Sequence, residues 1–152
     1  MILTTSKNDE LDDDYVDLKY RKLTPAINQI IDICNQGVHF IWGKLGNQQH
    51  KIMSHNILYF EWVDYQSCIY TEEQVYTTKQ SVTLLEKQLD GDTFIRVSKQ
   101  AVINVHKVKS ISPAWNMKAT VELSNGERVV VSRNYRHQLL VAIYKLDKEV
   151  TT

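Results

Sequence analysis

The chain has 152 residues, of which 43% are hydrophobic and 24% are charged, and it contains five glycines and two prolines. These values are ordinary for a globular protein, and the length suits one principal domain with disorder limited to the ends. No stretch approaches the ~20 apolar residues of a membrane span, and no signal peptide is evident, so we expect a cytoplasmic protein.

The formal net charge is zero, but charge is distributed unevenly along the chain. Residues 1–17 hold one lysine against six acidic residues, a net charge of −5, whereas residues 94–145 hold nine basic residues against two acidic ones, a net charge of +7. Contact with several backbone phosphates requires such a cationic segment, although a solvated surface is an equally good interpretation. We expect an acidic disordered head at 1–14 and a disordered tail at 148–152.

Residues 15–50 are expected to form a short strand-helix extension that precedes the main domain. Val16, Leu18 and Tyr20 alternate with charged residues, which predicts an edge strand with one buried face.

A helix is predicted from Thr24, a capping residue, and Pro25, which suits the first helical position; Gly37 is expected to end it. The helix carries an apolar stripe that should pack on its own domain, with a dimerisation or partner surface as the alternative. The stripe consists of Ile27, Ile30, Ile31 and Cys34.

From residue 38 onward, short β-branched and aromatic runs alternate with turn-forming residues, which predicts antiparallel strands joined by tight turns. The runs are VHFIW, HKIM, ILYFEWV, SCIYT and QVYTT, with turns at Gly46-Asn47, Ser54-His55-Asn56, Asp64-Tyr65-Gln66 and Glu72-Glu73.

Ser81 is expected to cap a second helix that ends at Asp90-Gly91, after which strands resume with FIRVS, AVINV and VKSIS. The clearest hairpin is ATVELS-NG-ERVVVS, because Asn125-Gly126 suits a type I′ turn with both central residues at positive φ. Ser132 is expected to cap a last helix that runs through Leu146.

No common nucleotide-binding or hydrolase motif occurs, so neither an enzyme nor a cofactor is expected. His50 and His55 lie close in sequence but have no evident third ligand, so we expect no metal site. Cys34 and Cys68 lie in apolar-rich segments without CxxC spacing and are expected to be buried thiols.

Basic and polar residues recur where the strands of the C-terminal third end. Ser98 and Lys99 follow one strand, and Arg133, Asn134 and Arg136 cluster at the start of the last helix. Unpaired backbone N–H groups at a helix start favour a phosphate, and arginine and amide side chains suit the edges of guanine and adenine. On these residues alone, DNA contact and a solvated surface are equally good interpretations.

One combination of segments is more specific: ILYFEWVDYQSCIYT, the helix SVTLLEKQL, DTFIRVSKQAVINVHKVKSI, the NG hairpin and VVVSRNYRHQL. Within it, F-x-R-x-S-K-x-x-x-x-N followed by V-S-R is distinctive. From about Ile52 to Leu146 the chain therefore resembles the LytTR family of bacterial transcription regulators. The resemblance implies a mainly β fold over 51–147, an elongated multi-sheet β sandwich of three sheets with small helices. It also implies DNA binding through loops that reach successive major grooves.

The resemblance implies base or groove contacts from the turn at Gln66 and Ser67, from Lys99 and from Arg133. It implies supporting contacts, mainly to phosphates, from Arg96, Ser98, Asn134 and Arg136. Many family members have a His followed by Arg, Lys or Asn where this chain has Ser98-Lys99, so its preferred DNA sequence should differ. Asn104 matches a family Asn, but among apolar neighbours we expect it to hydrogen-bond structurally.

The resemblance implies that the partner is double-stranded DNA with paired direct or inverted repeats in a promoter. It also implies a homodimer, which forms in solution or only on DNA. The first fifty residues are too short for a receiver domain. The chain thus resembles the stand-alone subgroup, whose members are often restrained by an adjacent small membrane protein. The alternatives are a β-rich protein–protein interaction module without DNA binding, and a small β-fold enzyme or ligand-binding domain. The DNA-binding hypothesis requires Lys99 and Arg133 to share one surface.

Overall fold

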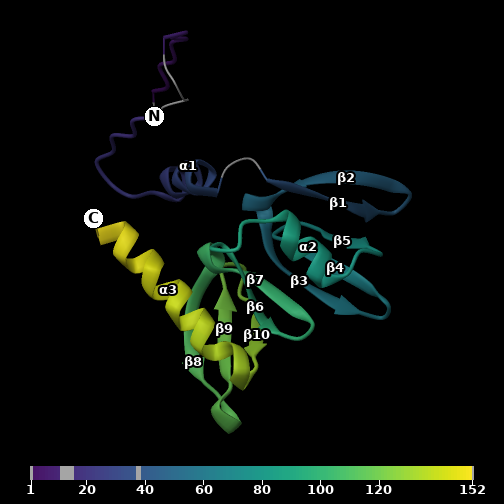
Figure 1. Cartoon of the computed structure of the whole chain (residues 1–152). Helices are drawn as coiled ribbons and strands as arrows, with labels where there is room; N and C mark the ends of the chain where they lie inside the picture. The colour runs from purple at the N-terminus through teal and green to yellow at the C-terminus, as the bar shows by residue number, and fades with distance from the viewer. Residues whose placement is uncertain (1, 11–15, 37–38, 152) are drawn as a thin grey trace.

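The computed structural model describes residues 2–10, 16–36 and 39–151, and its architecture is mainly β (Figure 1). The strands are β1 (Phe40–Leu45), β2 (Gln48–Met53), β3 (Ile57–Val63), β4 (Gln66–Thr71), β5 (Val75–Thr78), β6 (Phe94–Ser98), β7 (Ala101–Asn104), β8 (Val108–Pro113), β9 (Ala119–Leu123) and β10 (Arg128–Val131). The helices are α1 (Pro25–Gln36), α2 (Val82–Gln88) and α3 (Arg136–Thr151), with 3-10 turns η1 (Ser54–Asn56), η2 (Val105–Lys107), η3 (Trp115–Met117) and η4 (Arg133–Tyr135).

The strands of the described residues form two antiparallel sheets, of seven and three strands, rather than the three sheets that the resemblance implies. The order in the large sheet is β2-β1-β5-β4-β3-β7-β6, and the order in the small sheet is β10-β9-β8. Lys44 of β1 pairs with Thr77 of β5, which joins the β1–β2 hairpin to the central strands and makes one sheet of them. The domain boundary expected after residue 50 therefore falls inside β2.

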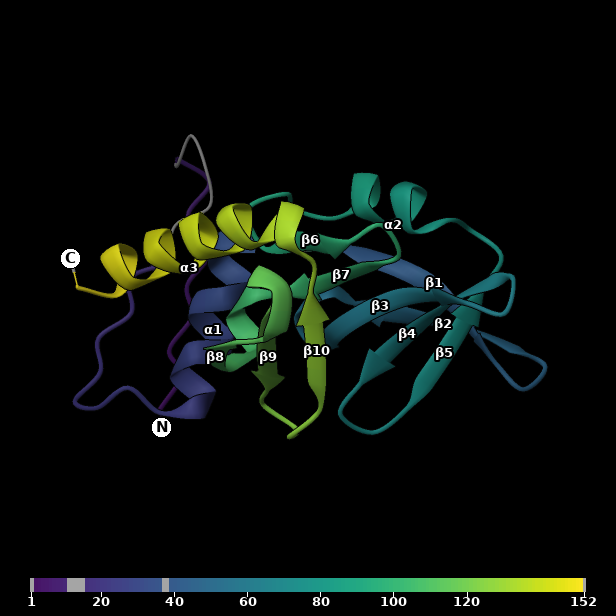
Figure 2. The same ribbon diagram turned by 90° about the horizontal axis from the view of Figure 1, so that it is seen from below.

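Two apolar layers hold the molecule together. One face of the large sheet packs against α2, where Phe60 and Leu85 are fully buried. The other face packs against the small sheet and α3, where Val97, Val121 and Leu139 are fully buried. Figure 2 shows α3 running past the small sheet and α2 lying over the large one. Burial of each such side chain contributes about 1.5–3 kcal/mol, so the strand ends project from a rigid base.

Two stacked tyrosines line the second of these layers. The rings of Tyr59 and Tyr70 are parallel to within 5°, with their centroids 4.2 Å apart, and the Tyr70 hydroxyl donates to Glu61 at 2.9 Å. Burial raises the pKa of both phenols; the charge of Glu127 adds to the effect at Tyr59, and the hydrogen bond to Glu61 adds at Tyr70.

Helix α1 begins as the sequence predicts. The Ile27 amide donates to the Thr24 hydroxyl at 3.3 Å, and the apolar stripe is partly covered, with Ile27 buried and Ile30 half-buried. The prediction that Cys34 is buried is wrong, because its side chain is exposed at the end of the stripe. Cys68 is half-buried in β4, and burial raises the pKa of its thiol. Gly37, the expected end of the helix, lies outside the described residues.

Two predictions at the ends of the chain are wrong. Residues 16–20 form no strand, and Val16 and Tyr20 are 63% and 50% exposed, because their alternating pattern finds no neighbouring strand to pair with. The tail expected to be disordered at 148–152 is helical as far as Thr151, because α3 continues five residues beyond Leu146.

The turn chemistry also differs from expectation at two places. Gly126 has a φ of 86°, but Asn125 is not among the residues at positive φ, and the Gly126 amide donates to Leu123 O at 2.9 Å. The NG hairpin is therefore a type I turn followed by a left-handed glycine, not type I′. At the last helix, the Ser132 side chain makes no capping hydrogen bond, and η4 precedes the start of α3 at Arg136.

Candidate nucleic-acid interface

Backbone pairing places the β3–β4 and β6–β7 turns at the same edge of the large sheet. Glu61 near the end of β3 pairs with Ala101 at the start of β7, and the Trp62 amide donates to Gln100 O at 2.8 Å. The two turns therefore project in the same direction, at the lower edge of the molecule in Figure 1.

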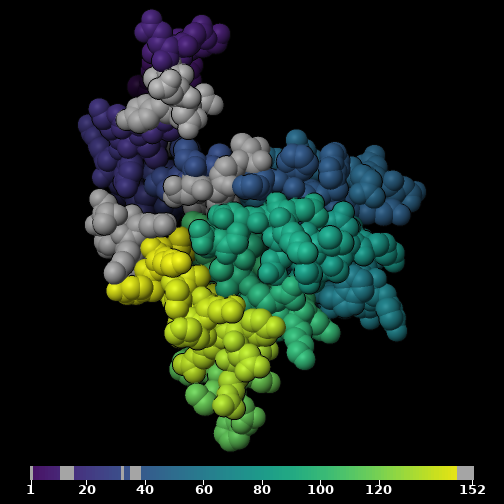
Figure 3. Space-filling model, viewed as in Figure 1, coloured from purple at the N-terminus to yellow at the C-terminus, as the bar shows by residue number. Residues whose placement is uncertain are grey.

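Two further connections lie at this edge. The Ser132 amide donates to Val97 O at 2.8 Å, which holds the β10–α3 junction beside the end of β6. Val131 pairs with Ala119, so the β8–β9 turn lies beside the same junction. We call this set of connections, residues 64–65, 99–100, 114–118 and 132–136, the strand-end edge. Figure 3 shows it as a row of separate projections along the lower side.

Lys99 and Arg133, the two cations that the hypothesis requires on one surface, both lie on the strand-end edge and are both exposed. Lys118 in the β8–β9 turn is exposed as well, and Arg136 is half-exposed at the first position of α3. Asp64 is the one acidic residue within the edge as defined, so the edge carries an excess of positive charge.

The β6–β7 turn is held by its own backbone while its side chains stay available. The Gln100 amide donates to the Ser98 hydroxyl at 3.2 Å, and Lys99 O accepts from Arg96 at 2.7 Å. Lys99 and Gln100 are exposed and Ser98 is half-buried. The turn therefore presents a cation and an amide on a fixed backbone.

Arg96 is engaged within the protein. Its side chain is 18% exposed and forms an ion pair with Glu86 of α2, from Nε to Oε2 at 2.8 Å. A second nitrogen donates to Lys99 O at 2.7 Å, and the third donates to the Thr83 hydroxyl at 3.1 Å. The phosphate contact predicted for Arg96 would have to compete with these bonds.

The two residues for which the resemblance implies DNA contacts at the β3–β4 turn, Gln66 and Ser67, differ in their exposure. Gln66 is half-exposed, whereas Ser67 is completely buried and donates its hydroxyl proton to Gln80 O at 2.7 Å. Ser67 therefore cannot reach DNA in this conformation, and that prediction is wrong. The reason is the two-residue period of a strand, which turns Ser67 inward together with Ile69.

At the β10–α3 junction, the structure brings together the residues that the sequence predicted. Arg133 and Asn134 are exposed in η4, and Arg136 follows at once as the first residue of α3. The Tyr135 amide donates to Ser132 O at 3.0 Å within η4, and the positive end of the α3 dipole at Arg136 suits an anionic group.

The strand-end edge also holds features that sequence reasoning missed. Asp64, Tyr65, Asn116 and Met117 are the described non-glycine residues at positive φ, and all four lie in the β3–β4 and β8–β9 turns. Tyr65 and Trp115 in these turns are 87% and 85% exposed. Residues with positive φ concentrate at functional sites. The sequence signal that was available is Tyr65, an aromatic residue between the polar residues Asp64 and Gln66 in a predicted turn.

Asn104 has the structural role that was expected. It is fully buried, its amide nitrogen donates to Ile57 O at 3.0 Å, and its oxygen accepts from the His106 amide at 3.0 Å. These bonds tie β7 to the start of β3 and so support the strands behind the edge.

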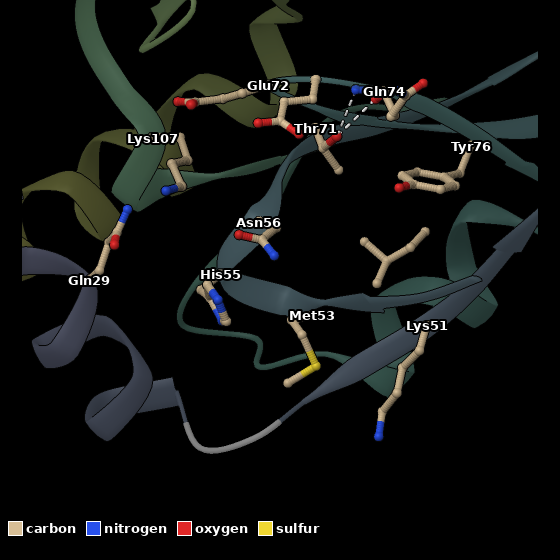
Figure 4. Close-up of a pocket in the computed structure, with 12 residues that line it drawn as sticks. Gln29, Lys51, Met53, His55, Asn56, Thr71, Glu72, Gln74, Tyr76 and Lys107 are labelled. Carbon is tan, nitrogen blue, oxygen red and sulfur yellow. Dashed lines mark hydrogen bonds between the residues drawn. The ribbon is translucent and has the colours of Figure 1, made fainter. Parts of the chain in front are cut away.

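The described part of the chain has a polar cavity of about 340 Å³ near the other end of these strands (Figure 4). Gln29 of α1, His55 and Asn56 of η1 and Lys107 of η2 line it, together with the β4–β5 turn, whose Thr71 hydroxyl donates to Gln74 O at 3.0 Å. The described residues contain no group of three or more potential metal ligands. None of the described helices is both long and apolar enough to cross a membrane.

Comparison with known proteins gives a consistent result. A model of the LytTr DNA-binding domain matches residues 47–143. The sensory transduction protein LytT of Bacillus subtilis is 26% identical over 121 residues, which are 80% of this chain and 50% of that protein. The transcriptional regulatory protein LytR of Staphylococcus aureus (strain N315) is 24% identical over 100 residues, which are 66% of this chain and 41% of that protein. The chain thus spans half or less of the length of these two relatives.

A solved structure supports the same assignment through its fold. The LytTr DNA-binding domain of a Bacillus cereus protein, described as a methyl-accepting/DNA response regulator, has a TM-score of 0.64 and 29% sequence identity. The alignment covers 68% of this chain and 98% of that one. From the matched residues and the fold, the chain belongs to the LytTR family of DNA-binding domains.

Proposed function

We propose that this protein is a bacterial transcription regulator that acts in the cytoplasm and binds duplex DNA sequence-specifically through its strand-end edge. The observation that carries the proposal is the common position of Lys99, between β6 and β7, and Arg133, after β10, on one exposed, cationic edge. Loops on a rigid sheet base can enter grooves without a recognition helix.

In the proposed complex, side chains of the strand-end edge and of two adjoining residues, Gln66 and Ser98, contact successive major grooves. Arg133 reads the two acceptors of a guanine, and Lys99 and Gln66 contact base edges at the neighbouring turns. Ser98, Asn134 and Arg136 bind phosphates and fix the register of the protein on the duplex. Tyr65 and Trp115 join this interface because both are exposed in turns of the same edge.

We further propose a homodimer on paired direct or inverted repeats, each copy facing the same side of the duplex. The half-covered stripe of α1 is the candidate for contact between the copies. As in the family subgroup described above, a small membrane protein is a candidate inhibitory partner.

A salt titration tests the proposal directly. Four cations at the edge, Lys99, Lys118, Arg133 and Arg136, predict that log Kobs falls with log[salt] with a slope of about −3 to −4 for each bound copy. The probe is a labelled duplex from the promoter of the protein's own operon, compared with a shuffled duplex of equal length. Equal, salt-independent binding to both duplexes would refute DNA recognition and favour the interaction-module alternative.

Arg133→Ala separates base reading from simple attraction. If Arg133 reads a base, its loss costs about 1–3 kcal/mol on the cognate duplex and relaxes the preference at one position. Lys99→Ala provides the matched comparison: loss at one operator position indicates base reading, whereas uniform loss with a shallower salt slope indicates phosphate contact. An Arg133→Ala variant with unchanged affinity and preference would contradict the assigned role.

A further inference from the structure

The guanidinium of Arg96 lies between helix α2 and the β6–β7 turn, and each of its three nitrogens has a partner. Nε pairs with Glu86 at 2.8 Å, one terminal nitrogen donates to Lys99 O at 2.7 Å, and the other donates to the Thr83 hydroxyl at 3.1 Å. Two partners belong to α2, and the third is the backbone of the residue proposed to enter DNA.

Helix α2 is a fixed support for this contact. The Ser81 hydroxyl accepts from the Leu84 amide at 3.2 Å and caps the helix, and Val82 and Leu85 are buried beneath it. Because Thr83 and Glu86 extend from this anchored helix, they restrict where the Arg96 guanidinium can lie. A planar guanidinium that makes hydrogen bonds in three directions has little conformational freedom.

The turn itself is held from both sides. Lys99 O accepts from Arg96, and the next carbonyl, Gln100 O, accepts from the Trp62 amide at 2.8 Å. The turn has only two residues, since Ser98 pairs with Ala101. Both of its peptide groups are therefore fixed, while both side chains point to solvent.

We propose that Arg96, Glu86 and Thr83 form a positioning network that pre-organises the Lys99 turn for sequence reading, so that Arg96 acts through Lys99 and does not itself bind phosphate. The inference rests on the proposed DNA-binding function of this edge. A pre-organised loop loses less conformational freedom on binding, so the network increases affinity for the cognate sequence above all.

Glu86→Gln distinguishes the two roles by the sign of its effect. The substitution removes a negative charge near the DNA, so if Arg96 bound phosphate directly, affinity for any duplex would stay the same or rise. If the network positions the turn, affinity for the cognate duplex falls about three- to tenfold, while affinity for a shuffled duplex does not fall. Thr83→Val, which keeps the shape and removes the hydroxyl, should show the same selective loss to a smaller degree.

The experiment uses the full chain and fluorescence anisotropy. The probes are a labelled duplex of about 40 base pairs, enough for two half-sites, enriched from a random pool by the wild type, and a shuffled duplex of equal composition. Glu73→Gln is the matched control, because it makes the same charge change on an exposed residue of the β4–β5 turn, at the opposite ends of the strands. Thermal melting of each variant checks its fold.

A second readout needs no DNA. Backbone NMR order parameters of Lys99 and Gln100 should fall in Glu86→Gln and Thr83→Val and stay at the wild-type value in Glu73→Gln. Unchanged order parameters, or unchanged cognate affinity in both network variants, would overturn the positioning role. A wild type that enriches no sequence, with order parameters that still fall, would refute the DNA-binding proposal but leave the network as the support of the turn.

Discussion

Replacing Asn104 by alanine would remove an amide that joins two strands behind the strand-end edge. Its nitrogen donates to Ile57 O and its oxygen accepts from the His106 amide, both at 3.0 Å, and the side chain is fully buried. A buried polar group that loses its partner costs about 1–3 kcal/mol. The substitution removes the partner of two groups, the Ile57 carbonyl and the His106 amide, and the cost at the amide is smaller because it is only part-buried. We therefore expect a total loss of about 2–4 kcal/mol in the free energy of unfolding.

For a chain of this length, that loss corresponds to a melting temperature lower by roughly 5–15 °C. Asn134→Ala is the matched control, because Asn134 is exposed on the strand-end edge and its removal should change stability by no more than about 0.5 kcal/mol. Urea denaturation measures stability, and anisotropy well below the melting temperature measures DNA affinity. Asn104→Ala should lower stability and spare affinity, and Asn134→Ala should do the reverse. Lost affinity with unchanged stability in Asn104→Ala would refute the structural role of this residue.

Three further substitutions or conditions test other parts of the structure. Tyr65 has a φ of 64°, which is strained for any residue with a Cβ, so Tyr65→Gly should keep stability or raise it by up to about 1 kcal/mol, whereas Tyr65→Ala should not raise it. Both variants should weaken DNA binding. A loss of stability in the glycine variant would contradict the turn conformation. Gly43→Ala should cost about 1–3 kcal/mol in urea melts, since its Cβ would lie 2.7 Å from Ile52 Cδ1 and 2.8 Å from Tyr76 Cβ, and a neutral effect would argue against this close packing. Burial raises the pKa of Tyr59 above its value in the unfolded chain, so the stabilising contribution of its neutral phenol should be complete below about pH 10 and decrease as the pH rises further. Tyr59→Phe has no phenol to ionise, so its stability should decline less above about pH 10. An equal decline in the wild type and in Tyr59→Phe would contradict the raised pKa of Tyr59.

Much of the secondary structure could be predicted because its signals are local. The Thr24 cap and the alternating runs each specify their own element, and β3 to β10 lie where the runs predict them. Residues 16–20 show the limit of such signals: alternation describes a face to be buried, but only the tertiary structure decides whether a neighbouring strand exists.

The predicted turn type of the NG hairpin is wrong for a related reason. An Asn-Gly pair suits a type I′ turn and also a type I turn followed by a left-handed glycine, and the strand register selects between them. Here Arg128 pairs with Glu122, which leaves a longer loop. The two-residue turn with both φ values positive occurs instead at Asp64 and Tyr65, which have side chains that give no such signal.

The site was predictable in part. Lys99 and Arg133 follow strand ends in the sequence and share one exposed edge in the structure. The inward direction of Ser67 could have been read from its alternation with Ile69. By contrast, the side-chain partners of Arg96, Glu86 and Thr83, lie ten and thirteen residues away on a helix, and no local sequence pattern predicts such contacts.

The most direct test of the whole account is an NMR titration of the isotope-labelled chain with its cognate duplex, following every backbone amide. We predict that the largest shift changes gather at the four connections of the strand-end edge, with Lys99 and Arg133 at their centre. Largest changes in the β1–β2 hairpin or around the polar cavity, with the strand-end edge unaffected, would contradict it.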